Sequence, residues 1–474
     1  MASNVYTLSF PAPYLGLAQS SYKDENYTIG GNNVFSRIHN CSLYNPNGIS
    51  NSPLMEDKAV GELLHNITDY CVKTNTAYGI SNSKIWSINN NNLISEEHTF
   101  AGGNNTYGNS ICKLDNYLYY FYNTSSGMNI GRSDLNSTYE DTFITLIGST
   151  SGTTSFSDGQ SGIIPTRALN VAGTKNAENL IMFGHGNQLG FLTPTNIVKQ
   201  VVDMSSDSEI VDIDLHNGYI VVGINNKLSN KNSDVYYFSQ NIAETEDTYG
   251  YVHINGKIGC LISDNGTLYV VYSTEDNVVR VAYLNGSTLV DITSFKGSLP
   301  NCFQKTKVMD FLMLKSGTNV VAIGNSAVGL GVATYNYESC NTDNGCIAAP
   351  FNSLIISGTK QLNNIISFIT SNYNSDSYVE TLTINTDNID NVSTLNQILI
   401  DTNPLLNKEE LEVDFYVDGL YHKTEKANNP SGRQEITAPN KVKTLKLVIR
   451  WKSNKQVLIK NISFKFNTNE YSSE

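Results

Sequence analysis

The residues best placed to do chemistry are three aspartates in the middle of the chain. Asp212 and Asp214 lie two positions apart on a predicted strand, so their side chains share one face of it. Asp310 occupies a similar place in a later copy of the same strand pattern. Two carboxylates that converge on one sugar ring are the chemistry of glycoside hydrolysis. Aspartates at strand ends also hydrogen-bond to backbone groups, and this second interpretation fits the same residues.

The rest of the sequence gives a hydrolase little support. A sialidase-type propeller needs several converging arginines and repeated Ser-x-Asp-x-Gly-x-x-Trp boxes, and residues 263–266 are out of register for such a box. The GxSxG, HExxH, Walker and paired CxxC motifs are absent from the sequence. The histidines are dispersed, without a pair spaced to bind a metal: His39, His65, His98, His185, His216, His253 and His422. We therefore predict that the protein is not an enzyme and has no catalytic, metal-binding or cofactor-binding residues.

The aspartates belong to a unit that recurs along the chain. Each unit is a short apolar strand, a tight turn, a strongly apolar strand, a polar loop and a third strand. The clear copies turn at 115–116, 217–218, 265–266 and 316–317, and their Asn, Asp and Gly residues favour the positive φ angles of tight hairpins. From residue 217 onward the turns are spaced by roughly 50 residues, a period typical of β-propeller blades.

Burial explains the second strand of each unit. Residues 117–121 and 219–222 are nearly continuous apolar runs, as expected for strands covered on both faces by neighbouring blades. Weaker copies at 70–88, 167–192 and 365–384 extend the array to about seven blades, within a range of six to eight. A long β-sandwich, or two stacked ones, is the alternative. The side chains predicted to be buried between blades are Tyr119, Phe121, Ile220, Val222, Val270 and Val321.

The patterns divide the chain into three segments. Residues 1–65, rich in proline, asparagine and glycine, are predicted to be an extended N-terminal arm that packs on the ring or completes its closure. Residues 66–390 form the predicted propeller. Residues 391–474 are predicted to be a C-terminal β-sandwich, since Leu445, Leu447 and Ile449 alternate with more polar neighbours. We expect the propeller and the sandwich to fold separately.

Composition excludes several classes of partner. The net charge is −13, and the 31 Lys and Arg residues form no basic block, which argues against direct sequence-specific binding of nucleic acid. No apolar run is long enough for a transmembrane segment, and residues 1–19 do not have the pattern of a signal peptide. The odd number of cysteines, seven, indicates mostly reduced thiols, although Cys340 and Cys346 are spaced to close a local disulfide.

The overall organisation resembles that of a known class of proteins. A proline-containing arm, a propeller rich in Asn, Ser, Thr and Tyr without a catalytic motif, and a C-terminal sandwich with the Lys-bearing strand 443–451 are similar to bacteriophage tail proteins built on a β-propeller, such as nozzle and tail-tip proteins. The resemblance implies a structural virion protein, made in the host cytoplasm, that forms a homo-oligomeric ring in the tail. Its implied partners are other tail proteins and a host-surface glycan.

Two other functions fit the same sequence. A carbohydrate-binding propeller agrees with the abundance of Asn, Ser, Thr and Tyr, which suit wet, hydrogen-bonded contacts. A propeller glycoside hydrolase is the less favoured alternative, and it depends on Asp212, Asp214 and Asp310.

Overall fold

Every regular element that the structure describes is a β-strand. The structure is a computed structural model, and among the described residues it is all-β, as predicted. It describes residues 4–11, 16–17, 34–42, 47–102, 106–124, 127–136, 138–145, 168–171, 180–192, 198–229, 231–239, 248–275, 277–308, 311–324, 332–336, 345–385, 393–405, 410–437 and 444–468.

Most of the chain folds into a succession of four-stranded antiparallel sheets, in which strands adjacent in sequence pair with each other. Sheet 1 contains β7 (Asn66–Ile67), β8 (Thr76–Ile80), β9 (Lys84–Asn89) and β10 (Ile94–Thr99). Sheet 2 contains β11 (Tyr107–Leu114), β12 (Tyr117–Thr124), β13 (Gly127–Ser133) and β14 (Tyr139–Thr145). Sheet 3 contains β15 (Ala168–Val171), β16 (Leu180–His185), β17 (Gln188–Leu192) and β18 (Val198–Asp203).

The succession continues with four more sheets of the same kind. Sheet 4 contains β19 (Ser208–His216), β20 (Tyr219–Asn226), β21 (Ser233–Ser239) and β22 (Thr248–Ile254). Sheet 5 contains β23 (Lys257–Asp264), β24 (Thr267–Glu275), β25 (Val278–Asn285) and β26 (Thr288–Lys296). Sheet 6 contains β27 (Lys305–Val308), β28 (Phe311–Ser316), β29 (Asn319–Gly324) and β30 (Val332–Asn336). Sheet 7 contains β31 (Ile347–Ala348), β32 (Ile355–Lys360), β33 (Asn363–Tyr373) and, from the N-terminal segment, β6 (Pro53–Ala59).

Both faces of the second strand in each clear unit are covered. All six central residues of β12 and of β20 are buried, whereas the residues of the outer strands β10 and β26 are mostly half-buried or exposed. The predicted turns have the expected backbone, since Asp115, Asn217 and Asn265 all have positive φ angles. The six side chains predicted to lie between blades are all buried. The loss of alternation in sequence therefore did report burial on two faces.

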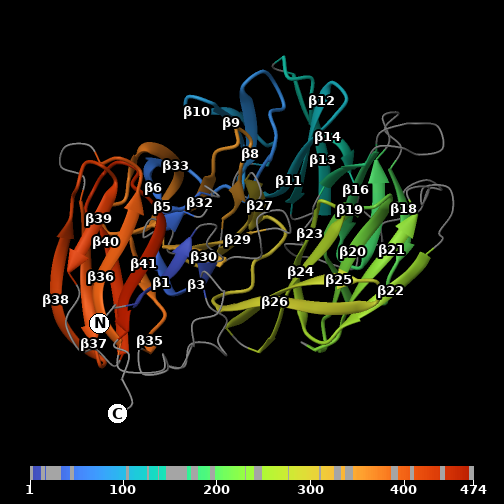
Figure 1. Cartoon of the computed structure of the whole chain (residues 1–474). Helices are drawn as coiled ribbons and strands as arrows, with labels where there is room; N and C mark the ends of the chain where they lie inside the picture. The colour runs from blue at the N-terminus through green and yellow to red at the C-terminus, as the bar shows by residue number, and fades with distance from the viewer. Residues whose placement is uncertain are drawn as a thin grey trace, which may run out of the picture.

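An apolar cluster fills the space between each sheet and the next. Sheets 1 and 2 share a cluster around Tyr78 and Tyr120, and sheets 2 and 3 share one around Phe121 and Phe183. Similar clusters lie between sheets 3 and 4, sheets 4 and 5, and sheets 5 and 6. Sheets 6 and 7 meet in the largest cluster, and sheets 7 and 1 meet around Trp86. Sheets stacked radially in this way are the arrangement of a β-propeller, and Figure 1 shows them fanned from cyan through green to yellow.

Strands from the two ends of the chain pair with one another in two further sets beside the four-stranded sheets. One of the two sets is a sheet in the order β39-β36-β41-β5-β4, with β1 also paired to β41. Its strands are β1 (Asn4–Pro11), β4 (Cys41–Ser42), β5 (Ile49–Asn51), β36 (Ser393–Thr402), β39 (Arg433–Thr437) and β41 (Leu458–Thr468). The other sheet continues sheet 6 in the order β30-β2-β3-β34-β40-β37-β38, with β35 paired to β40. Its added strands are β2 (Gly16–Leu17), β3 (Val34–His39), β34 (Tyr378–Thr381), β35 (Ile384–Asn385), β37 (Leu411–Val417), β38 (Leu420–Ala427) and β40 (Thr444–Trp451).

We call these strands the terminal sheets. In Figure 1 their orange and red C-terminal strands lie at the left, beside the blue strands β1 and β3. The N-terminal segment thus contributes strands to both terminal sheets and to sheet 7. The boundaries at 65 and 390 themselves stay predictions.

Two of the weaker predicted strands are placed differently from the expectation. Residues 378–384 were expected beside 365–371 in a last blade, but β34 pairs with β3 and β40 in a terminal sheet. The place beside β33 is taken by β6. Residues 70–74 form no strand, and the first strand of sheet 1 is β7. The error at β34 arises because its partner β3 lies hundreds of residues away in the chain, where local periodicity carries no information. The error at 70–74 is local, since β7 pairs with β8 only about ten residues further on.

Candidate functional site

A pocket lies where the innermost strands of several sheets begin. The first strands of most successive sheets contact one another, so they line the inner side, or axis, of the sheet array. The pocket has a volume of about 310 Å³, within the range of small-molecule sites. The side chains that matter for its chemistry are His65, Tyr107, Glu209, Lys257, Leu299 and Asn301. These come from sheets 1, 2, 4 and 5 and from the segment that precedes β27, which places the pocket at one end of the axis.

One wall of the pocket is an imidazole packed on a phenol. The rings of His65 and Tyr107 lie 4.5 Å apart at 33°. His65 Nε2 donates to Asn82 Oδ1 at 2.7 Å, and the Tyr107 hydroxyl lies 3.4 Å from His65 Nδ1. Burial lowers the pKa of His65, while the Asn82 hydrogen bond and the charge of Glu62 partly oppose this shift. The burial of this wall therefore disfavours the protonated form of the imidazole.

The floor of the pocket is held by a buried amide that joins two sheets. Asn225 of β20 donates to the carbonyl of Ile258 at 2.8 Å and accepts from its N–H at 2.9 Å. The Ser233 hydroxyl also donates to Asn225 Oδ1, at 2.8 Å. An amide with three partners in a buried site has little freedom to rearrange. Sheets 4 and 5 are thus fixed relative to each other next to the pocket.

Two opposite charges enter the pocket from adjacent inner strands. Glu209 is half-buried near the start of β19, and Lys257 is exposed at the start of β23. Among the residues that the structure describes, neither side chain forms a hydrogen bond or an ion pair. Both groups are therefore available to a molecule in the pocket.

The aspartates that the sequence singled out lie deeper along β19, and the structure uses them to join strands. Asp212 is fully buried, accepts from the N–H of Leu261 at 2.7 Å and pairs with the ammonium of Lys305. Asp214 accepts from the N–H of Ser263 at 3.0 Å and lies 3.8 Å from Lys305 Nζ. These contacts link β19 to β23 and β27, as the strand-bonding interpretation expects. Asp310 lies outside the described residues.

Lys305 is the residue that the sequence analysis missed. It begins β27, its side chain is 5% exposed, and it donates to both Asp212 and the carbonyl of Leu261. A lysine is seldom buried unless it is paired. The only signal was a lysine at the start of a strand two repeat units after Asp212 and Asp214, which local sequence cannot distinguish from edge protection.

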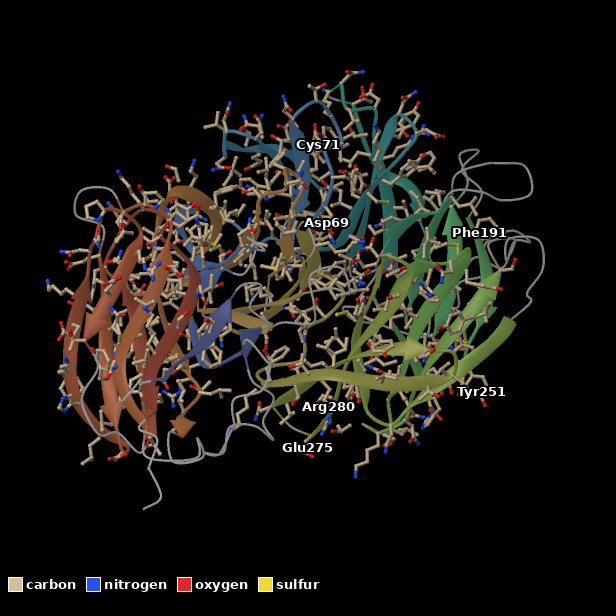
Figure 2. The ribbon with its side chains drawn as sticks, viewed as in Figure 1. Asp69, Cys71, Phe191, Tyr251, Glu275 and Arg280 are labelled. Atoms are coloured by element: carbon tan, nitrogen blue, oxygen red, sulfur yellow. The ribbon has the colours of Figure 1, made fainter. Side chains whose placement is uncertain are left out.

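A third aspartate connects the first sheet to the last two. Asp69 follows β7 and accepts from the hydroxyl of Thr306 at 2.8 Å and from the N–H of Ala349 at 3.2 Å. Cys71 Sγ lies 3.4 Å from the carbonyl oxygen of Pro350. Figure 2 labels Asp69 near the middle of the molecule, with Cys71 above it. These bonds join sheets 1, 6 and 7 around the axis.

Several other groups that could do chemistry are structural where the structure describes them. His98 pairs with Asp141 at 2.6 Å and stacks on Tyr139 at 4.2 Å, on the outer part of sheets 1 and 2. Hydrogen bonds from His98 and Tyr120 lower the pKa of Asp141 against the opposing effect of its burial. Within the described residues no cluster of three or more His, Cys, Asp or Glu side chains is arranged to hold a metal.

The cysteines behave as the sequence suggested wherever they are described. Cys41, Cys112, Cys260, Cys302 and Cys346 are buried, Cys71 is exposed, and no disulfide joins any two of these described cysteines. Burial raises the pKa of the Cys41 and Cys112 thiols, which disfavours the reactive thiolate. Cys340, the predicted partner of Cys346, lies outside the described residues.

Comparison with known proteins gives a fold-level likeness and no family. No protein-family model matches the sequence, and no curated protein matches it either. Solved structures that align include a virginiamycin B lyase from Staphylococcus aureus, with 11% identity over 67% of this chain and 99% of the other and a TM-score of 0.46. The Cps50 (Swd1) β-propeller domain of Myceliophteria thermophila aligns with 10% identity over 67% of this chain and 100% of the other, also with a TM-score of 0.46. Similarity this low carries no conclusion about activity.

In the described part of the chain, no helix has the length and apolar character needed to cross a membrane.

Proposed function

We propose that this protein is a non-enzymatic structural component of a bacteriophage tail, where copies assemble into a ring-shaped nozzle or tip. The observation that carries the proposal is that the candidate catalytic carboxylates are used to hold the molecule together. Asp212 and Asp214 bind backbone N–H groups of β23 and the ammonium of Lys305. The Asp212 carboxylate is buried and paired, which keeps it from a substrate, and Asp214 is held by its bond to the N–H of Ser263.

The proposed architecture is that of a stiff scaffold. We infer that sheets 1 to 7 are the seven blades of one closed propeller, and that β6 closes the ring by completing sheet 7. Apolar clusters at every junction between successive sheets support this count. The terminal sheets, with one apolar core between them, support the proposed sandwich. A propeller without a catalytic centre commonly serves as a rigid support.

The tail assignment rests on the organisational resemblance of the sequence, and it predicts a ring of identical subunits. A closed ring places one patch of each subunit against a different patch of its neighbour. Mass photometry and electron microscopy of the purified full chain should therefore show one symmetric particle of several subunits. A monomer at all accessible concentrations, also in the presence of adjoining tail proteins, would overturn the ring.

Localisation to the virion needs its own test. Mass spectrometry of purified phage particles should detect the chain in stoichiometric amount, and portal, tail or terminase genes should neighbour its gene. Cytoplasmic synthesis followed by absence from purified particles would exclude the virion role.

The second candidate function is carbohydrate binding, which the axial pocket favours. Its volume, its polar side chains and its available charges suit a small polar ligand. A host-surface glycan would be the corresponding partner in a tail protein. Glycoside hydrolysis is the weakest candidate, because Asp212 and Asp214 do not line the pocket. Release of new reducing ends from a host polysaccharide, abolished by Asp212→Asn, would overturn the non-enzymatic proposal.

A further inference from the structure

The axial pocket contains a carboxylate and an ammonium that do not serve the fold. Glu209 of β19 and Lys257 of β23 both line it, and among the described residues neither side chain is paired. Asp212, three positions along β19 from Glu209, is instead fully paired with Lys305. In sheets 4 and 5, Asp212 therefore has a structural role, whereas the charged groups of Glu209 and Lys257 face the pocket.

The open charges define what a ligand must offer. A carboxylate only accepts hydrogen bonds and an ammonium only donates them. The complementary molecule therefore carries an anionic group for Lys257 and hydrogen-bond donors for Glu209. Asn301 adds a side-chain amide. Its Oδ1 accepts from the N–H of Phe303 at 2.9 Å, which leaves the amide nitrogen as its second polar group. These groups suit a ligand with both a carboxylate and hydroxyl groups.

The remaining lining indicates the shape of the ligand body. Val211, Ile258, Leu299 and Pro300 give the pocket an apolar side, opposite in character to its charged groups. A pyranose ring has apolar C–H faces and a polar rim, so it matches a pocket with both kinds of wall. An amino acid also carries a carboxylate for Lys257 and an ammonium donor for Glu209, but it has no broad ring to cover the apolar residues of the pocket.

We propose that this pocket binds an acidic saccharide, with the sugar carboxylate on Lys257 and sugar hydroxyls donating to Glu209. The site is independent of ring assembly, because all of these residues belong to one subunit. Binding is weakened by salt, because Lys257 is exposed and its attraction for an anion is screened.

The test uses the full-length chain and three probes: glucuronate, glucose and serine. Isothermal titration calorimetry should show saturable binding of glucuronate, at least about tenfold weaker binding of glucose, and no binding of serine. Lys257→Gln should weaken glucuronate binding by about tenfold and remove the preference over glucose. Glu209→Gln should weaken both sugars and keep the preference for the acidic one.

Matched variants separate the pocket from general charge effects. Lys296→Gln at the end of β26 removes one positive charge from an exposed site, and Glu275→Gln, labelled in Figure 2, removes one exposed negative charge. Both should leave glucuronate affinity unchanged, and all four variants should keep the wild-type melting temperature. Absence of saturable glucuronate binding, equal affinity for glucose, stronger binding of serine, or an equal loss in Lys257→Gln and Lys296→Gln would each overturn the proposal.

Discussion

At the scale of single residues, the buried pair of Lys305 and Asp212 sets the geometry around the axis. A buried ion pair is expensive to form, and removing one partner leaves the other charge without compensation. Lys305→Met should therefore lower the free energy of unfolding by about 3–5 kcal/mol. Urea unfolding followed by circular dichroism would measure this change.

Lys307 provides the control on the same strand. It pairs with Asp264 at 3.3 Å, but its side chain is 48% exposed. Solvent screens such a pair, so Lys307→Met should change stability by less than about 1 kcal/mol. Equal effects of the two substitutions would mean that Lys305 is not held in a dry site.

His65 makes stability depend on pH. Burial lowers its pKa below the ordinary value of 6.5, so the unfolded chain takes up a proton before the folded chain does. The free energy of unfolding should therefore fall as the pH drops from about 7 to about 5. His65→Gln should reduce that slope, and His422→Gln, an exposed change on β38, should not. Part of the slope should persist in His65→Gln, because burial also lowers the pKa of His216. An unchanged slope in His65→Gln would contradict the assignment.

At the scale of elements, the middle strands depend on both of their faces. Val222 of β20 is fully buried in the cluster between sheets 3 and 4. Val222→Asp would place an unpaired charge there, and we expect no soluble protein. Leu228→Asp, just after the same strand, changes a side chain that is 79% exposed and should leave yield and melting temperature unchanged. Normal behaviour of Val222→Asp would remove β20 from the position between two sheets.

The sequence correctly predicted the strands whose burial and turns are encoded by residues close together in the chain. The continuous apolar runs of β12 and β20 and the turns at Asp115 and Asn217 follow from burial on both faces and from turn chemistry. The partners of β34 and β6 could not be predicted in this way, since they are set by chain segments hundreds of residues apart.

The pocket escaped prediction for the same reason. His65, Tyr107, Glu209 and Lys257 are far apart in sequence, and each has the ordinary appearance of a polar residue at a strand end. The three aspartates attracted attention because they recur in the repeat, yet repetition favours structural roles. Asp212 and Asp214 each accept a backbone N–H of the neighbouring first strand β23, which is a structural role.

At the scale of the whole molecule, the two chain ends are joined to each other and to the sheet array. β1 pairs with β41 along its full length, and Phe10 packs on Phe464 at 5.8 Å. Asn51 is fully buried and donates to the carbonyls of Asn374, Ser453 and Lys455 at 3.0–3.1 Å. The largest apolar cluster runs without a break from Met313 of sheet 6 to Trp451 of β40. One continuous apolar core therefore joins the terminal sheets to sheets 6 and 7.

From this continuity we now expect that residues 391–474 do not fold apart from the rest of the chain, in contrast to the expectation from the sequence. Residues 395–474 expressed alone would lack β34, which pairs with β40, and β1 and β5, which pair with β41. We expect that fragment to be insoluble or unfolded, with no dispersed amide signals by NMR. A folded and soluble fragment would support a domain boundary close to residue 390.

Cleavage of the folded chain gives the complementary result. A protease site placed between residues 386 and 392 would cut the backbone without removing any of the pairings that the structure describes. The two pieces should then co-elute on gel filtration at the mass of the intact chain, because the pairing of β1 with β41 and of β34 with β40 holds them together. They should separate only in denaturant, and they should not reassociate efficiently on dilution, because each piece alone exposes part of one shared core. Elution of two independent folded pieces under native conditions would show that the terminal sheets are a separate domain.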